Sequence, residues 1–177
     1  MQLRKTKTDN WRQHFHIGCI VISVCCPAMA NAGPQNGFGL YAGAIGASEN
    51  GMSSKGLSIG VDAQFTINDN WSLNPFLMAS AEHSSVSTTV SDELVGLQIR
   101  RWFGDWFVGG QVFAHDRLIV GNGTTQNSSY GVAPGVLAGV EYASGWGTEI
   151  QADTFENSAT AGVSRNAVRL HLTYRWH

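Results

Sequence analysis

Two histidines of the chain stand next to groups with which they could carry out acid–base chemistry. His83 is followed by Ser84 and Ser85, and His115 is followed by Asp116. A hydrolase or acyltransferase needs a nucleophile with a base within hydrogen-bonding reach, and these neighbours supply such groups. A histidine beside a serine in a polar segment is also common by chance, so we predict no catalytic residues.

A second set of polar residues consists of charged side chains that alternate with apolar residues. The set is Asp62, Arg100, Glu141, Glu149, Asp153, Arg169, His171 and Arg175. Opposite charges gathered in a narrow interior can satisfy one another, whereas each alone is costly to bury. The set predicts either an internal polar plug, which we favour, or a narrow gated ion path; the sequence does not separate the two.

The first thirty residues differ in composition from the rest and resemble a targeting segment. Four Lys and Arg residues precede an uncharged run at 17–26, and small residues then stand at cleavage spacing. About 10 apolar residues are too few for a transmembrane helix, which needs roughly 20. We predict a signal peptide over 1–30, cleaved after Ala30 or Ala32, and a single domain over 31–177.

The leader also contains every cysteine of the chain, namely Cys19, Cys25 and Cys26. The exported part therefore offers no thiol for a disulfide or a zinc site, and we predict no cofactor and no metal. It holds seven Lys and Arg (eleven in the chain, four in the leader) against twelve Asp and Glu (thirteen, one in the leader). Without a basic patch to neutralise phosphates, we expect no nucleic-acid partner.

A period of two in hydrophobicity dominates the exported part. From Leu57 to Ile67 every odd position is apolar and every even position is polar or glycine, as in a strand with one oily face. The pattern recurs at 71–82, 95–102, 106–115, 132–142, 146–153 and 168–176, with a weaker strand at 38–46. The prediction is an all-β fold, a closed antiparallel up-and-down transmembrane β-barrel of about eight strands.

The predicted connections alternate in length. Short turns are expected at 68–70, 104–105 and 143–145, and long loops near 48–54, 83–91, 116–129 and 156–165. Bacterial outer-membrane barrels have tight periplasmic turns and longer external loops, so both termini are predicted on the periplasmic side. An apolar cluster, Leu118 to Val120, is interpreted as the end of a strand that extends above the membrane.

The tryptophans support this orientation, because they lie beside the short turns or at the chain's end. They are Trp71, Trp102, Trp106, Trp146 and Trp176. We predict that they form a periplasmic aromatic girdle at the level of the lipid headgroups.

A secreted soluble barrel or sandwich is the alternative architecture, since it also alternates apolar and polar residues. Its outer face would be the polar series, which carries little charge; Lys55 is the one lysine after the leader. The sequence favours a barrel with lipid outside.

The chain resembles a known superfamily, the small eight-stranded outer-membrane barrels. These include the transmembrane domain of outer-membrane protein A, the attachment/invasion proteins and the opacity-like proteins. The resemblance rests on the hairpins FTINDNWSLNPFL and GVLAGVEYASGWGTEI and on the C-terminal strand AVRLHLTYRWH. Such a strand is read by the barrel-assembly machinery and typically ends in an aromatic residue, whereas here Trp176 is followed by His177.

The resemblance implies location in the outer membrane of a Gram-negative cell, with outer-membrane lipids and lipopolysaccharide as partners. Some barrels of this size are lipid A deacylases, but their His-x-Ser-Asn motif is absent, and the corresponding stretch reads QADTFENSATAG. We therefore predict a monomeric, non-enzymatic protein with a structural or adhesion-type role, whose loops contact a surface ligand. The runner-up functions are a lipid A-modifying enzyme and a narrow gated channel.

Overall fold

The computed structural model describes residues 33–49, 51–84, 88–121, 124–156 and 164–177. The predicted signal peptide and its cleavage site lie outside these residues. The eight strands are β1 (Gly37–Glu49), β2 (Met52–Asn68), β3 (Trp71–Ser84), β4 (Thr88–Phe103), β5 (Trp106–Gly121), β6 (Thr124–Glu141), β7 (Trp146–Glu156) and β8 (Ser164–Trp176). Within the described ranges there is no helix of the length and apolarity that a membrane crossing requires.

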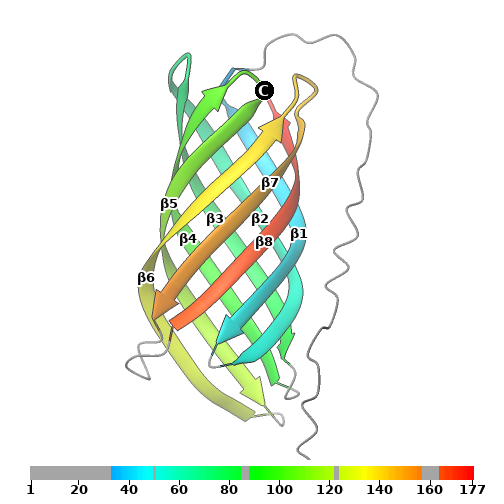
Figure 1. Cartoon of the computed structure of the whole chain (residues 1–177), viewed down its shortest axis with the longest axis vertical. Helices are drawn as coiled ribbons and strands as arrows, with labels where there is room; N and C mark the ends of the chain where they lie inside the picture. Colours follow the sequence, from blue (N-terminus) through cyan, green and yellow to red (C-terminus); the bar gives the residue numbers. More distant parts are fainter. Residues whose placement is uncertain (1–32, 50, 85–87, 122–123, 157–163) are drawn as a thin grey trace, which may run out of the picture.

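The strands form one closed ring in which each is antiparallel to its sequence neighbours and β8 pairs with β1 (Figure 1). Along this seam Phe38 lies opposite Trp176 at one end, and Glu49 lies opposite Arg165 at the other. Closure gives every strand two neighbours and so removes the exposed edges of an open sheet. The predicted eight-stranded up-and-down barrel is confirmed.

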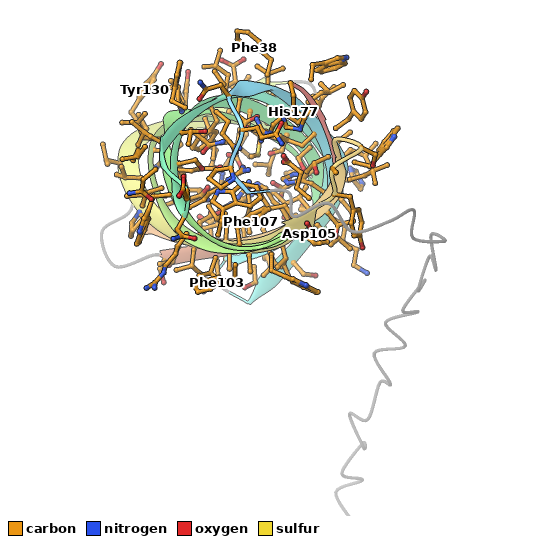
Figure 2. All side chains as sticks on the ribbon, turned by 90° about the horizontal axis from the view of Figure 1, so that it is seen from above. Phe38, Phe103, Asp105, Phe107, Tyr130 and His177 are labelled. Carbon is orange, nitrogen blue, oxygen red and sulfur yellow. The ribbon has the colours of Figure 1, made fainter. Side chains whose placement is uncertain are left out.

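The alternation of apolar and polar residues in the sequence corresponds to side chains that face outward and inward in the barrel. On β2, Leu57, Ile59 and Val61 face outward and are 72%, 56% and 47% exposed. Asp62 and Gln64, at the alternate positions of the same strand, face inward and are 3% and 1% exposed. Figure 2 looks along the barrel and shows side chains on both sides of the wall. The barrel therefore has an apolar exterior and a largely polar interior.

Inward glycines make room for large side chains in the narrow lumen. A Cβ on Gly60 would come within 2.2 Å of Tyr41 Cε2, and one on Gly139 within 2.4 Å of Phe107 Cζ. Along β6, the inner glycines Gly131, Gly135 and Gly139 leave room for side chains of β5, namely those of His115, Gln111 and Phe107.

The short turns occur where they were predicted. Gly104 between β4 and β5 and Gly145 before β7 have φ of 68° and 82°, a conformation that glycine adopts without strain. The amide of Gly145 donates to the Tyr142 carbonyl at 2.8 Å, which closes the turn. In Figure 1 these turns lie at the same end of the barrel as the C-terminus.

The predicted long loops are wrong in extent, because the strands continue through most of those residues. The β4–β5 ladder runs without a break from Phe103–Trp106 to Thr88–Gly121, across segments that had been assigned to loops. Serine, threonine and asparagine are weak strand formers locally, but continued cross-strand pairing outweighs that preference. The interpretation of Leu118 to Val120 as the end of a strand is confirmed, since β5 extends to Gly121.

Candidate functional site

The structure places all eight charged residues predicted for the lumen inside the barrel. Each is between 0% and 6% exposed: Asp62, Arg100, Glu141, Glu149, Asp153, Arg169, His171 and Arg175. They come from β2, β4, β6, β7 and β8, so only barrel closure brings them together. Five of them form what we call the inner cluster: Asp62, Arg100, Glu141, Glu149 and Arg175.

Arg175 joins two carboxylates of the inner cluster. Its Nη1 and Nη2 donate to Asp62 Oδ1 and Oδ2 at 3.1 and 3.0 Å, a bidentate pairing, and its Nε donates to Glu141 Oε2 at 3.0 Å. A planar guanidinium suits this arrangement, because its donors are fixed in the geometry of a fork.

Arg100 holds the other side of the inner cluster. Its Nη2 lies 2.9 Å from Glu149 Oε2 and 3.4 Å from Asp62 Oδ2, and also donates to Gln98 Oε1 at 2.6 Å. Its guanidinium carbon sits 4.7 Å from the centre of the Phe107 ring. Gln151 completes the shell by donating to Glu149 Oε1 at 2.6 Å.

Neutral residues that the predicted set omitted extend this network. Asn74 donates to Asp62 Oδ2 at 2.8 Å, Ser72 donates to Asn74 Oδ1 at 2.9 Å, and the Trp102 indole donates to Ser72 Oγ at 3.0 Å. The signal that identifies them is their phase, since they alternate with the outward apolar residues as Asp62 and Arg100 do. Buried amides and hydroxyls need partners as much as charges do.

The interpretation of Trp102 as a member of the aromatic girdle is wrong. Its side chain is 2% exposed and packs inside the barrel with Phe107 and Leu137. The physical reason is register: Trp102 is two residues from the inward Arg100 and must share its face. Trp106 and Trp176 do face outward, with 66% and 53% exposure.

The remaining two tryptophans are also outside the wall. Trp146 is 50% exposed and stacks on Tyr174 with ring centres 4.9 Å apart, and Tyr174 in turn meets Trp176. Trp71 is half-buried beneath the Arg101 guanidinium, 5.7 Å from its ring centre. Four of the five predicted girdle residues thus lie on the outer surface near the turns.

A serine and a histidine meet at the centre of the lumen. Ser58 Oγ and His171 Nε2 are 2.7 Å apart, and the His171 ring lies 5.3 Å from that of Tyr41. A nucleophile and base need this proximity, but Ser58 and His171 are 4% and 1% exposed, and His171 Nδ1 has no hydrogen-bond partner among the described residues. We interpret the pair as structural, because both side chains are buried and neither lines the pocket at the mouth of the barrel.

The two histidines singled out in the sequence do not assemble such a site. His83 points outward while its neighbour Ser84 points inward and bonds to Thr88. His115 is 3% exposed and its ring packs 4.1 Å from the ring of Phe155. Adjacent residues of a strand face opposite sides of the sheet, which separates His83 from Ser84.

Apolar side chains interrupt the polar lumen. One buried group has members on six strands, namely Tyr41, Phe76, Met78, Leu94, Phe113, Ala133 and Phe155. The lumen is therefore filled by apolar as well as polar side chains. Arg169 and Asp153 pair with each other deep in the lumen.

A second charged cluster lies toward the end of the barrel opposite the turns. This outer cluster consists of Glu49, Glu82, Asp92, Arg117 and Arg165. Arg165 contacts Glu82 and lies 2.8 Å from Asp92, and Arg117 lies 2.5 Å from Glu49. This cluster was not predicted, because most of its members lie in segments that were predicted to be loops. The period of two, extended into those segments, identifies them.

No group of His, Cys, Asp and Glu able to hold a metal ion occurs among the residues that the structure describes.

Neither a family model nor a curated protein sequence matches the chain. Solved structures do match its fold. Ail, the attachment invasion locus protein of Yersinia pestis, solved with the heparin analogue sucrose octasulfate, superposes with a TM-score of 0.57 at 13% identity. The match covers 80% of this chain and 99% of Ail.

Neisserial surface protein A superposes similarly, with a TM-score of 0.55, 15% identity, and coverage of 80% of this chain and 97% of that protein. The chain has the fold of the small outer-membrane β-barrels. This confirms the resemblance predicted from the hairpins and the C-terminal strand. At such identities the likeness is one of fold, and function has to be argued from the residues.

Proposed function

We propose that the protein is a non-enzymatic barrel of a Gram-negative outer membrane, with a structural and surface-interaction role. The observation that carries this proposal is the outward belt of apolar side chains around a closed barrel. Leu170, Leu172 and Val168 on β8 are 60%, 53% and 50% exposed, and the other strands repeat the pattern. A surface of this kind is unfavourable in water and suits lipid acyl chains.

The same exterior carries a groove of about 720 Å³ that crosses several strands. Its lining includes the apolar residues Leu40, Ile59, Val61 and Leu77, and also the acidic residue Glu93. An apolar groove on a lipid-facing wall fits an acyl chain of the surrounding bilayer. Outer-membrane lipids and lipopolysaccharide are therefore its proposed contacts.

The aromatic residues give the barrel its proposed orientation. Trp106, Trp146 and Trp176 lie outside the wall near the turns, and aromatic side chains favour the membrane–water interface. The turns and the C-terminus then face the periplasm, and the opposite end faces the cell exterior. Export by a signal peptide over 1–30 and insertion by the barrel-assembly machinery belong to the same proposal.

The surface-interaction role rests on the sheet that extends toward the exterior. Among the described pairs, β6 joins β7 only from Gly135 onward, whereas it pairs with β5 up to Thr124. Figure 1 shows β5 and β6 reaching farther than β7 and β8 at that end. Tyr130 and Val132 on this extension are 67% and 72% exposed, which suits contact with a macromolecule.

We infer a plugged lumen rather than a gated ion path. The inner cluster pairs its charges internally, and the apolar side chains of Phe76 and Phe113 also fill the lumen. Planar-bilayer recordings of purified protein should show no stable conductance steps. Reproducible ion-selective steps would contradict this inference.

Heat-modifiable gel mobility of a membrane extract tests the proposal as a whole. A folded barrel should migrate faster unboiled than boiled and should fractionate with the outer membrane. A fully soluble periplasmic protein would contradict it. Mass analysis of the exported chain should show cleavage after Ala30 or Ala32.

The enzyme alternative has its own test, which uses lipid A. Mass spectrometry with and without expression should show the same acyl pattern, since the described Ser58–His171 pair is enclosed. A lost or added acyl chain would establish a lipid A-modifying activity.

A further inference from the structure

A pocket of about 400 Å³ opens at the mouth of the barrel, at the end opposite the turns. Hydroxyl groups dominate its wall, namely those of Ser48, Ser53, Ser54, Ser84 and Thr88. The pocket is independent of the outward surface around Tyr130. Its volume lies in the range of small-molecule sites, roughly 300 to 1,000 Å³.

The floor of this pocket is made by two arginines of the outer cluster. Arg117 and Arg165 are 3% and 1% exposed, so both are almost fully buried. Among the described residues, Arg117 Nε and Nη1 and Arg165 Nε have no hydrogen-bond partner, and neither has Asp92 Oδ1. Arg117 Nε is 3.7 Å from Asp92 Oδ1, too far for a hydrogen bond.

The unpaired donors belong to Arg117 and Arg165, which line the pocket, whereas Asp92 does not line it. Leaving buried donors unpaired costs free energy, so a ligand that accepts from them would be stabilised. A hydroxyl group can donate and accept at once, and vicinal hydroxyls can do so toward neighbouring side chains. Of the wall hydroxyls, Ser54 already donates to Glu82 and Ser84 bonds to Thr88, but a hydroxyl oxygen has two lone pairs with which it can accept.

The charge of the outer cluster argues against a simple anion as ligand. Its three carboxylates, Glu49, Glu82 and Asp92, outnumber its two guanidiniums. In addition, Arg117 Nη2 already donates to Glu49. This nitrogen is shared by the two donor pairs of the guanidinium, Nε with Nη2 and Nη1 with Nη2, so neither pair is free for a bidentate anion. A phosphate or sulfate prefers an open fork, whereas a single free N–H suits a hydroxyl.

The pocket also offers an apolar surface for the C–H face of a ligand. Met52, Val90 and Ile119 lie among its lining residues. A ligand with one polar edge and one apolar face would therefore be matched on both. Sugar rings have this character, and an ordinary inorganic ion does not.

We propose that the mouth of the barrel binds a neutral hexose unit of an extracellular glycan. Ring hydroxyls would accept from Arg117 and Arg165 and donate to the hydroxyl oxygens of the pocket wall. The inference rests on the proposed function only in placing the mouth outside the cell. It does not depend on the surface around Tyr130, so the two can fail separately.

Nuclear magnetic resonance of ¹⁵N-labelled protein in phosphocholine micelles tests the proposal, because these micelles carry no sugar headgroup. Methyl α-D-glucoside, methyl β-D-galactoside and methyl α-D-mannoside are each titrated, with sodium sulfate as the anion probe. We expect at least one glycoside to shift the Nε–H signals of Arg117 and Arg165 saturably. Silence with all three, or saturable shifts with sulfate alone, would overturn the proposal.

A variant and a matched control make the test specific. Arg117→Met should weaken glycoside binding at least tenfold, whereas Lys55→Met, which removes an exposed cation from β2, should leave it unchanged. Thr88→Val provides a second variant that keeps every ion pair of the outer cluster, and it should weaken binding severalfold. Unchanged affinity in a folded Arg117→Met barrel, or in Thr88→Val if the former does not fold, would overturn the assignment.

Discussion

The inner and outer clusters are built from the same residue types but differ in how completely their polar atoms are paired. Among the described residues, one buried polar atom of the inner cluster lacks a hydrogen bond, Glu149 Oε2, and it still lies 2.9 Å from Arg100 Nη2. The outer cluster has four such atoms, Asp92 Oδ1, Arg117 Nε and Nη1, and Arg165 Nε. Nearly complete pairing suits a plug that holds the barrel together, and less complete pairing beside a pocket suits a site that can form further hydrogen bonds.

The largest effect is expected from Arg175→Met in the inner cluster. This change leaves the buried carboxylates of Asp62 and Glu141 without their main partner, which should lower the free energy of unfolding by about 3–5 kcal/mol. Urea titration of the barrel in phospholipid vesicles, followed by gel mobility, measures it. Arg101→Met is the control, because Arg101 is exposed over Trp71 and should cost less than about 1 kcal/mol.

A smaller loss is expected from Arg165→Met in the outer cluster. Glu82 and Asp92 again lose a partner, but water entering through the mouth pocket can solvate them, so we expect about 1–3 kcal/mol. The same urea titration compares the two variants directly. A loss equal to that of Arg175→Met would show that water reaches neither cluster, which would contradict the proposed difference between them.

Trp102→Phe tests the edge of the inner network. The change keeps an aromatic ring against Phe107 but removes the indole donor to Ser72, so a loss of about 1 kcal/mol is expected. Fluorescence-detected unfolding measures it, read from the four outward tryptophans that remain. An unchanged or higher free energy of unfolding would show that this hydrogen bond does not stabilise the barrel.

The smallest effect on stability is expected from Arg117→Met. Arg117 is buried, but the side chain of its partner Glu49 is 14% exposed and lines the mouth pocket, where water can solvate it, so we expect a loss of about 1 kcal/mol. The variant should therefore fold normally and be suitable for the binding test. A loss above that of Arg165→Met would place Arg117 in the plug instead of the pocket.

Strand existence was predictable because it depends on local periodicity. The segment 57–67 alternates without exception, and the structure places its odd residues outside and its even residues as far as Gln64 inside. Strand ends were not predictable in the same way. Segments such as 116–129 have loop-like composition, yet pairing across the β5–β6 hairpin keeps most of them in the sheet.

The eight predicted lumen residues show the same division. Their inward orientation followed from phase alone, but their partners did not. Arg175 and Asp62 are 113 positions apart and meet because β8 closes on β1 and β2 lies beside it. Trp102 was misplaced for a related reason, since its position beside a turn was given more weight than its phase.

The sequence by itself determined that this chain forms an up-and-down barrel with an apolar outside, because a period of two is a property of neighbouring residues. Tertiary structure alone decided which charges pair, where apolar side chains pack in the lumen, and that a partly unpaired cluster lies beneath a pocket at the mouth. Those outcomes depend on the stagger of strands around a closed ring. That stagger is set by pairing between strands, and no single segment of the chain encodes it.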